Sequence, residues 1–100
     1  MSPVSDNRPL LLFFTRESSG PARRMESVLA HLARKERDRL RVARVDVAKR
    51  SDLAERFEVT EIPALVLLKE GRTVGRIDGR TSAPRIEAML EAALAPLAVA

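Results

Sequence analysis

The chain has 100 residues, of which 45% are hydrophobic and 32% charged, with three Phe, no Trp or Tyr, and a formal net charge of +4. This length supports one small domain with a modest aliphatic core, and the composition excludes a disordered chain. Cysteine is absent, which excludes disulfides, thiolate nucleophiles and sulfur-ligated metals. No apolar stretch reaches the roughly twenty residues of a membrane helix. The N-terminus lacks a signal-peptide pattern, so we expect a cytoplasmic protein.

Two apolar runs predict central strands of a sheet. "PLLLFFT" at residues 9–15 and "PALVLLK" at residues 63–69 are apolar on both faces, as in a strand covered on each side. "LRVARVDVA" at residues 40–48 is a further strand, and its arginines favour the sheet's edge. The turn "KEGRT" leads the second apolar run into a last strand at residues 73–79.

Three helices are predicted between and after these strands. Residues 21–36 carry apolar side chains at spacings of three and four, residues 52–57 form a short helix, and a third begins after Ser82. The residues expected to cap them are Ser19 or Gly20, Ser51, and Ser82. The order β-α-β-α-β-β-α predicts an α/β fold with a mixed sheet of about four strands flanked by helices.

Two segments carry a family resemblance. "SSGPAR" and "FEVTEIPALVLLKEGRTVGRIDG" resemble a thioredoxin, whose active turn reads Trp-Cys-Gly-Pro-Cys-Lys/Arg and whose second signature is Ile-Pro-Thr before a hairpin strand. The resemblance covers residues 10–94 and implies a thioredoxin-like fold, with one domain over residues 1–100. We expect residues 1–8 to be an N-terminal extension and residues 9–95 to be the core.

The extension is too short for the first strand and helix of full thioredoxins. The strand at residues 40–47 should therefore be an outer strand of the sheet, either bare or covered by a short N-terminal extension. Bare sheet edges invite pairing, and Arg41 and Arg44 are charges that discourage it. We expect a monomer or a weak homodimer.

The active turn departs from the family pattern. Ser18 stands in place of the Trp, while Ser19 and Ala22 stand in place of the two Cys, so that SGPA replaces CGPC. Gly20 and Pro21 match. Thioredoxin chemistry needs a thiolate that attacks a disulfide and a second sulfur that resolves it. Phe13 also falls where thioredoxins keep a buried Asp. The sequence thus predicts a redox-inactive protein that is not an enzyme.

Other kinds of catalysis lack the side chains that they require in this sequence. A serine nucleophile at Ser19 needs a base, and the single histidine, His31, lies twelve residues further along the same helix, about 18 Å away. The carboxylates Asp46, Asp52, Glu55, Glu58 and Glu61 show no metal-ligand spacing, and no glycine-rich phosphate loop accompanies them. We expect no metal, no cofactor and no catalytic residue.

The resemblance implies a groove for an extended peptide. Ile62, Pro63 and Gly79 would line it beside the turn, with a cis bond before Pro63. Our first hypothesis is an adaptor or holdase module that binds an unidentified protein or extended peptide there. The alternative is an engineered cysteine-free copy of an active thioredoxin, a thiol-disulfide oxidoreductase of redox homeostasis.

A third hypothesis is nucleic-acid binding through residues 34–44, "RKERDRLRVAR". Glu36 and Asp38 interrupt this basic run, and no aromatic side chains interleave for base stacking. The pattern favours a solvated helix end over a nucleic-acid site, and we expect no membrane partner.

Overall fold

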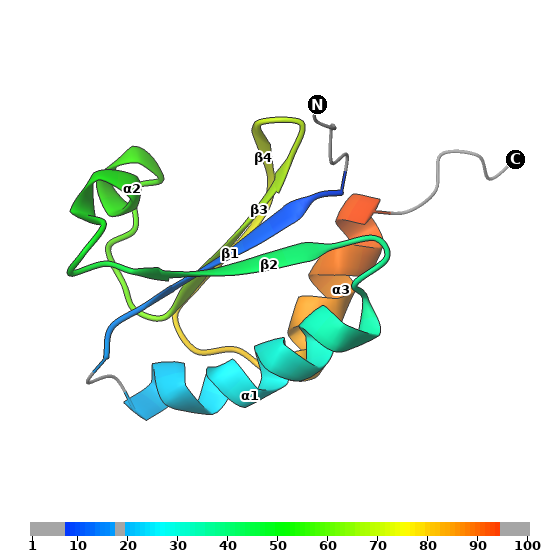
Figure 1. Cartoon of the computed structure of the whole chain (residues 1–100), viewed down its shortest axis with the longest axis horizontal. Coiled ribbons are helices and arrows are strands. Elements are labelled where there is room, and N and C mark those ends of the chain that lie inside the picture. Colours follow the sequence, from blue (N-terminus) through cyan, green and yellow to red (C-terminus); the bar gives the residue numbers. More distant parts are fainter. Residues whose placement is uncertain (1–7, 18–19, 95–100) are drawn as a thin grey trace, which may run out of the picture.

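The computed structural model describes residues 8–17 and 20–94, which form four strands and three helices (Figure 1). They follow one another in the predicted order. Their bounds are β1 Leu10–Thr15, α1 Gly20–Lys35, β2 Arg41–Asp46, α2 Ser51–Arg56, β3 Ala64–Lys69, β4 Arg72–Asp78 and α3 Ala83–Leu94. The predicted β2 was longer by one residue at its start and two at its end. None of the described helices is long and apolar enough to cross a membrane.

The strands form one mixed sheet in the order β2-β1-β3-β4. β1 pairs with β2 in parallel and with β3 antiparallel, and β3 and β4 form an antiparallel hairpin. β2 is an outer strand of this sheet, as predicted. β1 and β3 lie inside it, which explains why both are apolar on each face.

Two hydrophobic clusters cover the two faces of the sheet. On one face, Leu11 and Phe13 of β1 pack with α1 and α3, and Phe13 is 2% exposed. On the other face, Leu12 and Phe14 pack with side chains from α2 and the segment after it. Figure 1 shows α1 and α3 on one side of the sheet and α2 on the other. The alternation along β1 therefore divides one strand between two cores.

Tight backbone geometry shapes the β3–β4 hairpin. Glu70 and Gly71 both have positive φ, 53° and 79°, which is the backbone of a two-residue hairpin turn with the twist that strands prefer. The pairing register of β3 with β4 shifts between Leu67 and Leu68. Gly75, beside it, allows Met89 of α3 to approach, because a Cβ there would lie 2.9 Å from the Met89 Sδ.

The helix caps agree with the sequence in part. The Ser82 carbonyl accepts from the Ile86 amide at 3.0 Å, and its hydroxyl from the Arg85 amide at 3.4 Å, so Ser82 caps α3 as predicted. The prediction that Ser51 caps α2 was wrong. The Arg50 carbonyl accepts the first helical hydrogen bonds, so Arg50 is the cap and Ser51 is the first helical residue. The cap position of α1 falls on Ser19, outside the described residues.

Candidate functional site

The segment before β3 and the end of β4 meet at one end of the sheet. The Gly79 amide donates to the Pro63 carbonyl at 2.8 Å, one residue beyond the Ala64–Asp78 pair that ends the β3–β4 ladder. The Ile62–Pro63 bond, expected to be cis, is cis. Three residues that the sequence grouped together, Ile62, Pro63 and Gly79, are therefore neighbours. α1 begins at the same end of the sheet (Figure 1).

The backbone conformation at position 79 favours glycine. Its φ of +84° lies in the left-handed region, which L side chains rarely adopt. A Cβ at this position would also lie 2.7 Å from Oε2 of Glu61. Gly79 is buried, so the missing side chain lets the Glu61 carboxylate lie against the backbone beside Pro63.

An arginine of β4 fastens the segment that leads to Ile62. Arg76 donates from Nη1 to the Phe57 carbonyl at 2.6 Å and from Nη2 to the Glu58 carbonyl at 2.8 Å. Its Nε donates to Asp78 at 3.1 Å. One guanidinium thus satisfies two carbonyls at the end of α2, where helical backbone acceptors lack partners. Sequence reasoning missed this role, because the contact spans 18 residues or more.

The end of α2 has a left-handed residue. Glu58 has φ +54°. The Val59 amide donates to the Ala54 carbonyl at 2.8 Å, and the Glu58 amide to the Glu55 carbonyl at 3.0 Å. This pair of bonds is a Schellman motif, which usually has glycine where Glu58 stands. It turns the chain from α2 toward Ile62.

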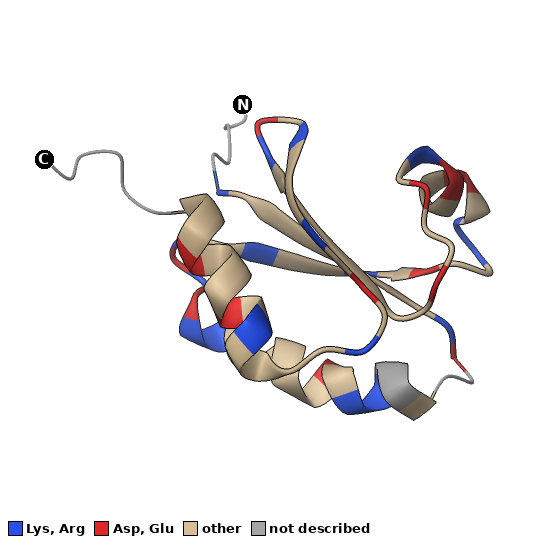
Figure 2. Cartoon of the chain, turned by 180° about the vertical axis from the view of Figure 1, so that it is seen from behind, with Lys and Arg blue, Asp and Glu red and all other residues tan. Residues whose placement is uncertain are grey.

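A pocket of about 380 Å³ lies beside this segment. Apolar side chains, two glutamates and one arginine are among its lining residues, which include Ile62. Figure 2 shows the acidic residues on α2 and on the segment after it. The lining residues are Arg16, Val47, Ser51, Ala54, Glu55, Glu58, Val59, Thr60 and Ile62.

The turn that would carry catalysis in the resemblance is only partly described. Ser18 and Ser19 lie outside the described residues. Gly20 is exposed, and a Cβ there would have no atom within 4 Å, so the start of α1 is open on that side. Pro21 and Ala22 follow in the first turn of α1.

The described residues near this turn offer little reactive chemistry. The chain has no cysteine, and His31 is exposed on α1. Thr15 ends β1 fully buried, and its hydroxyl has no hydrogen-bond partner among the described residues. Within residues 8–17 and 20–94, no group of three His, Asp or Glu side chains could hold a metal ion.

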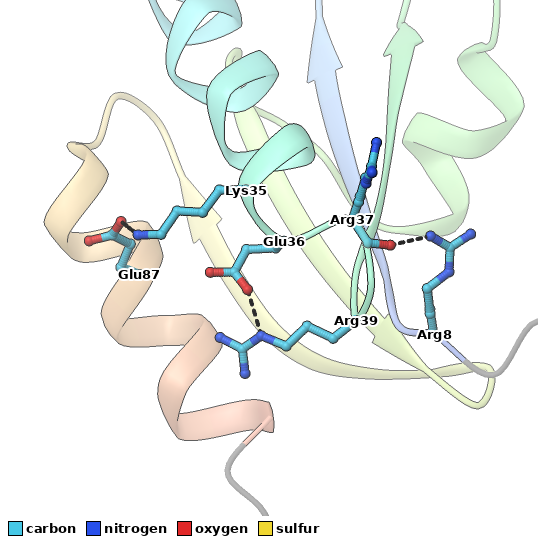
Figure 3. Close-up of polar contacts among 6 residues, drawn as sticks. All are labelled: Arg8, Lys35, Glu36, Arg37, Arg39 and Glu87. Atoms are coloured by element: carbon cyan, nitrogen blue, oxygen red, sulfur yellow. Dashed lines mark hydrogen bonds and ion pairs between the residues drawn. The ribbon is translucent and has the colours of Figure 1, made fainter.

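Much of the basic charge at residues 34–44 is paired with carboxylates. Arg39 contacts Glu36 at 2.6 Å, and Lys35 contacts Glu87 of α3 at 3.4 Å (Figure 3). Arg44 contacts Glu26 at 3.2 Å. These pairs link α1 to its neighbours and reduce the charge available to a phosphate backbone.

Sheet order, helix placement and the Pro63–Gly79 pair together define a thioredoxin fold. The thioredoxin family model matches residues 2–92, and the chain belongs to the thioredoxin family.

Individual relatives agree with this assignment. The chain is 37% identical over 76 residues to thioredoxin of Mycobacterium tuberculosis, an alignment that covers 76% of this chain and 66% of the relative. It is 36% identical over 76 residues to the bifunctional thioredoxin reductase/thioredoxin of Mycobacterium leprae, covering 76% of this chain and 17% of that protein. The chain thus spans less than two thirds of each. The crystal structure of Deadhead, a germline-specific thioredoxin of Drosophila melanogaster, matches with a TM-score of 0.82 at 30% identity, covering 87% of this chain and 82% of that one.

Proposed function

We propose that this thioredoxin-family chain is redox-inactive and binds extended peptide segments in the groove beside Ile62 and Pro63, as an adaptor or holdase. The observation that carries the proposal is the combination of a cysteine-free chain with an Ile62 backbone whose N–H and C=O groups have no backbone partner among the described residues. The Pro63–Gly79 hydrogen bond and the Arg76 contacts hold the segment that contains Ile62. Dithiol chemistry needs sulfur, whereas a groove that only binds does not.

The backbone of Ile62 supports strand-like pairing. Among the described residues, neither its N–H nor its C=O has a backbone hydrogen-bond partner. An extended peptide can pair with such groups, as in strand addition to a sheet. The start of α1 at Gly20 adds N–H groups that lack helical acceptors and favour a carbonyl or carboxylate. In this proposal Ser18, Ser19, Gly20, Ile62, Pro63 and Gly79 contact the peptide.

The experiment measures binding of a permanently unfolded, thiol-blocked chain, reduced and carboxymethylated α-lactalbumin. Gly20→Phe adds a side chain where the structure has open space, so it covers the groove without disturbing the core. We expect this variant to bind at least fivefold more weakly than the unmodified chain. Ser27→Phe, an exposed position two turns further along α1, is the matched control and should bind normally. Equal binding by all three proteins would refute the groove as the site.

The alternative function is that of a cysteine-free variant of a thiol-disulfide oxidoreductase. The identity to proteins named thioredoxins favours it. Phe13 opposes it, because disabling a working enzyme requires only the loss of the two sulfurs, and a buried Phe at the family's Asp position is an additional change. The codons at positions 19 and 22 of the source gene distinguish a natural from an engineered loss.

A further inference from the structure

The outer edge of β2 presents backbone groups away from the sheet. The Arg41 amide donates to the Pro9 carbonyl at 2.8 Å and the Val47 amide to the Thr15 carbonyl at 3.0 Å, so these odd-numbered residues bond toward β1. Bonding direction alternates along a strand. The N–H and C=O groups of Val42 and Arg44 therefore face outward, on a side where residues 8–17 and 20–94 supply no strand.

A pocket of about 300 Å³ lies between this edge and α1. Phe13 and Leu29 form its floor, and Val42 forms the wall on β2. The side chains from α1 at its mouth are Ala30, which is exposed, and Ala33, which is half-buried. Small side chains at these positions leave room for one bulky apolar group, which would remain in contact with the core.

The charged residues that line this pocket are Arg44 and Glu26, and two further arginines lie in the segment that follows Ala33. Arg44 lies at the rim with its side chain 54% exposed, paired with Glu26 at 3.2 Å. Arg34 follows Ala30 by one helical turn, so the two lie on the same side of α1. Arg34 and Arg37 are exposed, and neither forms an ion pair with another described residue. Figure 3 shows the Arg37 guanidinium pointing away from the Glu36–Arg39 and Lys35–Glu87 pairs.

We propose that this edge site, formed by the outward backbone of Val42 and Arg44 and the pocket over Ala30 and Ala33, binds an acidic, extended segment of a partner protein. The segment adds a strand beside β2. It places one bulky apolar side chain in the pocket. Acidic side chains two residues before and two residues after this apolar residue lie on the same face of the added strand. One of them lies toward Arg44, and the other lies toward Arg34 and Arg37. The edge site is separate from the groove at Ile62 and does not depend on the proposed function.

Charge complementarity favours a partner protein over a second copy of this chain. A second copy pairing through β2 would bring its own Arg41 and Arg44 against this edge, and like charges placed opposite each other destabilise strand pairs. An acidic strand has the complementary charge. Exposed apolar surface next to an open edge is then a recognition feature rather than a self-association surface.

The probe is an acetylated, amidated heptapeptide, TETFTET, whose Phe and two Glu side chains share one face of an extended strand. Two control peptides match it, with Lys replacing both Glu (TKTFTKT) or Ala replacing Phe (TETATET). Binding to the full chain is followed by amide chemical shifts at two salt concentrations. We expect TETFTET to shift Val42, Arg44 and Ala30, to bind at least fivefold more tightly than either control, and to weaken with salt.

Variants separate the pocket from the backbone edge. Ala30→Phe fills the pocket from an exposed position and should weaken binding at least fivefold, whereas Ala92→Phe, exposed on α3, should not. Arg44→Pro removes an outward N–H that no described strand uses, so it should abolish binding, while Arg44→Thr keeps the N–H and should weaken binding less. Amide spectra establish that each variant is folded.

Four results would overturn the proposal. The first is equal binding of the acidic and basic peptides. The second is protection of the Val42 and Arg44 amides from hydrogen exchange in the free chain, because the edge would already be covered by other parts of this chain or by a second copy. The third is unchanged binding by a folded Ala30→Phe variant. A dimer in sedimentation measurements that Arg44→Pro dissociates would likewise assign the edge to a second copy.

Discussion

The amide of Gly79 and the carbonyl of Pro63 are joined by a hydrogen bond of 2.8 Å, one step beyond the last residue pair of the β3–β4 ladder. This bond holds the end of β4 against the segment before β3, so the backbone at Pro63 and Gly79 continues the sheet. The adjoining strand β3 is buried over Ala64, Leu65, Val66 and Leu67.

Replacing Gly79 tests how strictly the groove depends on this geometry. Gly79→Ala places a Cβ at φ +84° and against the Glu61 carboxylate, so we expect a loss of about 1–3 kcal/mol in the free energy of unfolding. Urea unfolding measures it. The double variant Glu61→Ala, Gly79→Ala removes the clash and should recover only part of the loss. Full recovery would show that the backbone conformation costs nothing here.

Arg76 offers a second test, because it fastens the end of α2. We expect Arg76→Ala to lower the free energy of unfolding by about 1 kcal/mol, since it leaves two carbonyls without their donor at a partly exposed site. Hydrogen exchange at Glu58 and Val59, whose amides are hydrogen-bonded at the end of α2, should accelerate more than exchange in α3. Arg72→Ala, at an exposed position on the same strand, is the control. Uniform acceleration in both variants would argue against a local anchoring role.

The left-handed residue at the end of α2 predicts a stabilising substitution. Glu58→Gly removes the Cβ penalty at φ +54°, and we expect a gain of about 0.5–1 kcal/mol in unfolding free energy. Glu55→Gly, in the body of α2, should lose a comparable amount because glycine is a poor helix former. Thermal unfolding of the two variants should therefore shift in opposite directions. Two shifts of the same sign would contradict the assignment.

Stability should depend on pH through Glu36. A hydrogen bond from Arg39 lowers the pKa of the Glu36 carboxyl below its ordinary value. The folded state then binds its proton less readily than the unfolded state. The stabilisation is present above the unfolded pKa and is lost as pH falls through the folded pKa.

Glu36→Gln removes this dependence. We expect its stability to fall less than that of the unmodified chain as the solution is acidified through the titration range of Glu36. Denaturant unfolding at a series of acidic pH values measures the difference. Glu55→Gln, which removes an exposed carboxylate of α2, is the matched control.

Sequence patterns predicted the parts of the fold that depend on local hydrophobicity. The apolar runs predicted β1 and β3, and the charged residues Arg41 and Arg44 indicated the outer position of β2. They did not predict the Arg76 contacts or the left-handed Glu58. The first joins elements far apart in sequence, and the second is set by helix-end hydrogen bonds rather than by residue preference. The predicted cap of α2 was one residue too late. The Arg50 carbonyl accepts the first helical hydrogen bonds, whereas the preference of serine for cap positions pointed to Ser51.

The candidate site was predicted to a similar extent. Ile62, Pro63 and Gly79 lie together as expected, because their family spacing corresponds to a strand pair. The pockets at α2 and at β2 could not be predicted, since each is formed by side chains from several elements.

Restoring the two sulfurs tests whether the rest of the chain retains a catalytic environment. Insulin reduction by the unmodified chain should equal the protein-free control, since no thiol is present. Ser19→Cys with Ala22→Cys should give at most weak activity, because the buried Phe13 cannot assist proton transfer as the family's Asp does. Rates typical of thioredoxin from the double variant alone would favour the oxidoreductase alternative.

The most direct test of the account is amide chemical-shift mapping of the unmodified chain with reduced, carboxymethylated α-lactalbumin. We predict shifts that cluster at Gly20, Ile62 and Gly79 and at the neighbours of Ile62 in the pocket beside α2. Because the probe has no free thiol, such a pattern would demonstrate binding at the groove without redox chemistry. Shifts restricted to residues 34–44, or no shifts at saturating probe, would contradict the claim that this groove binds peptides.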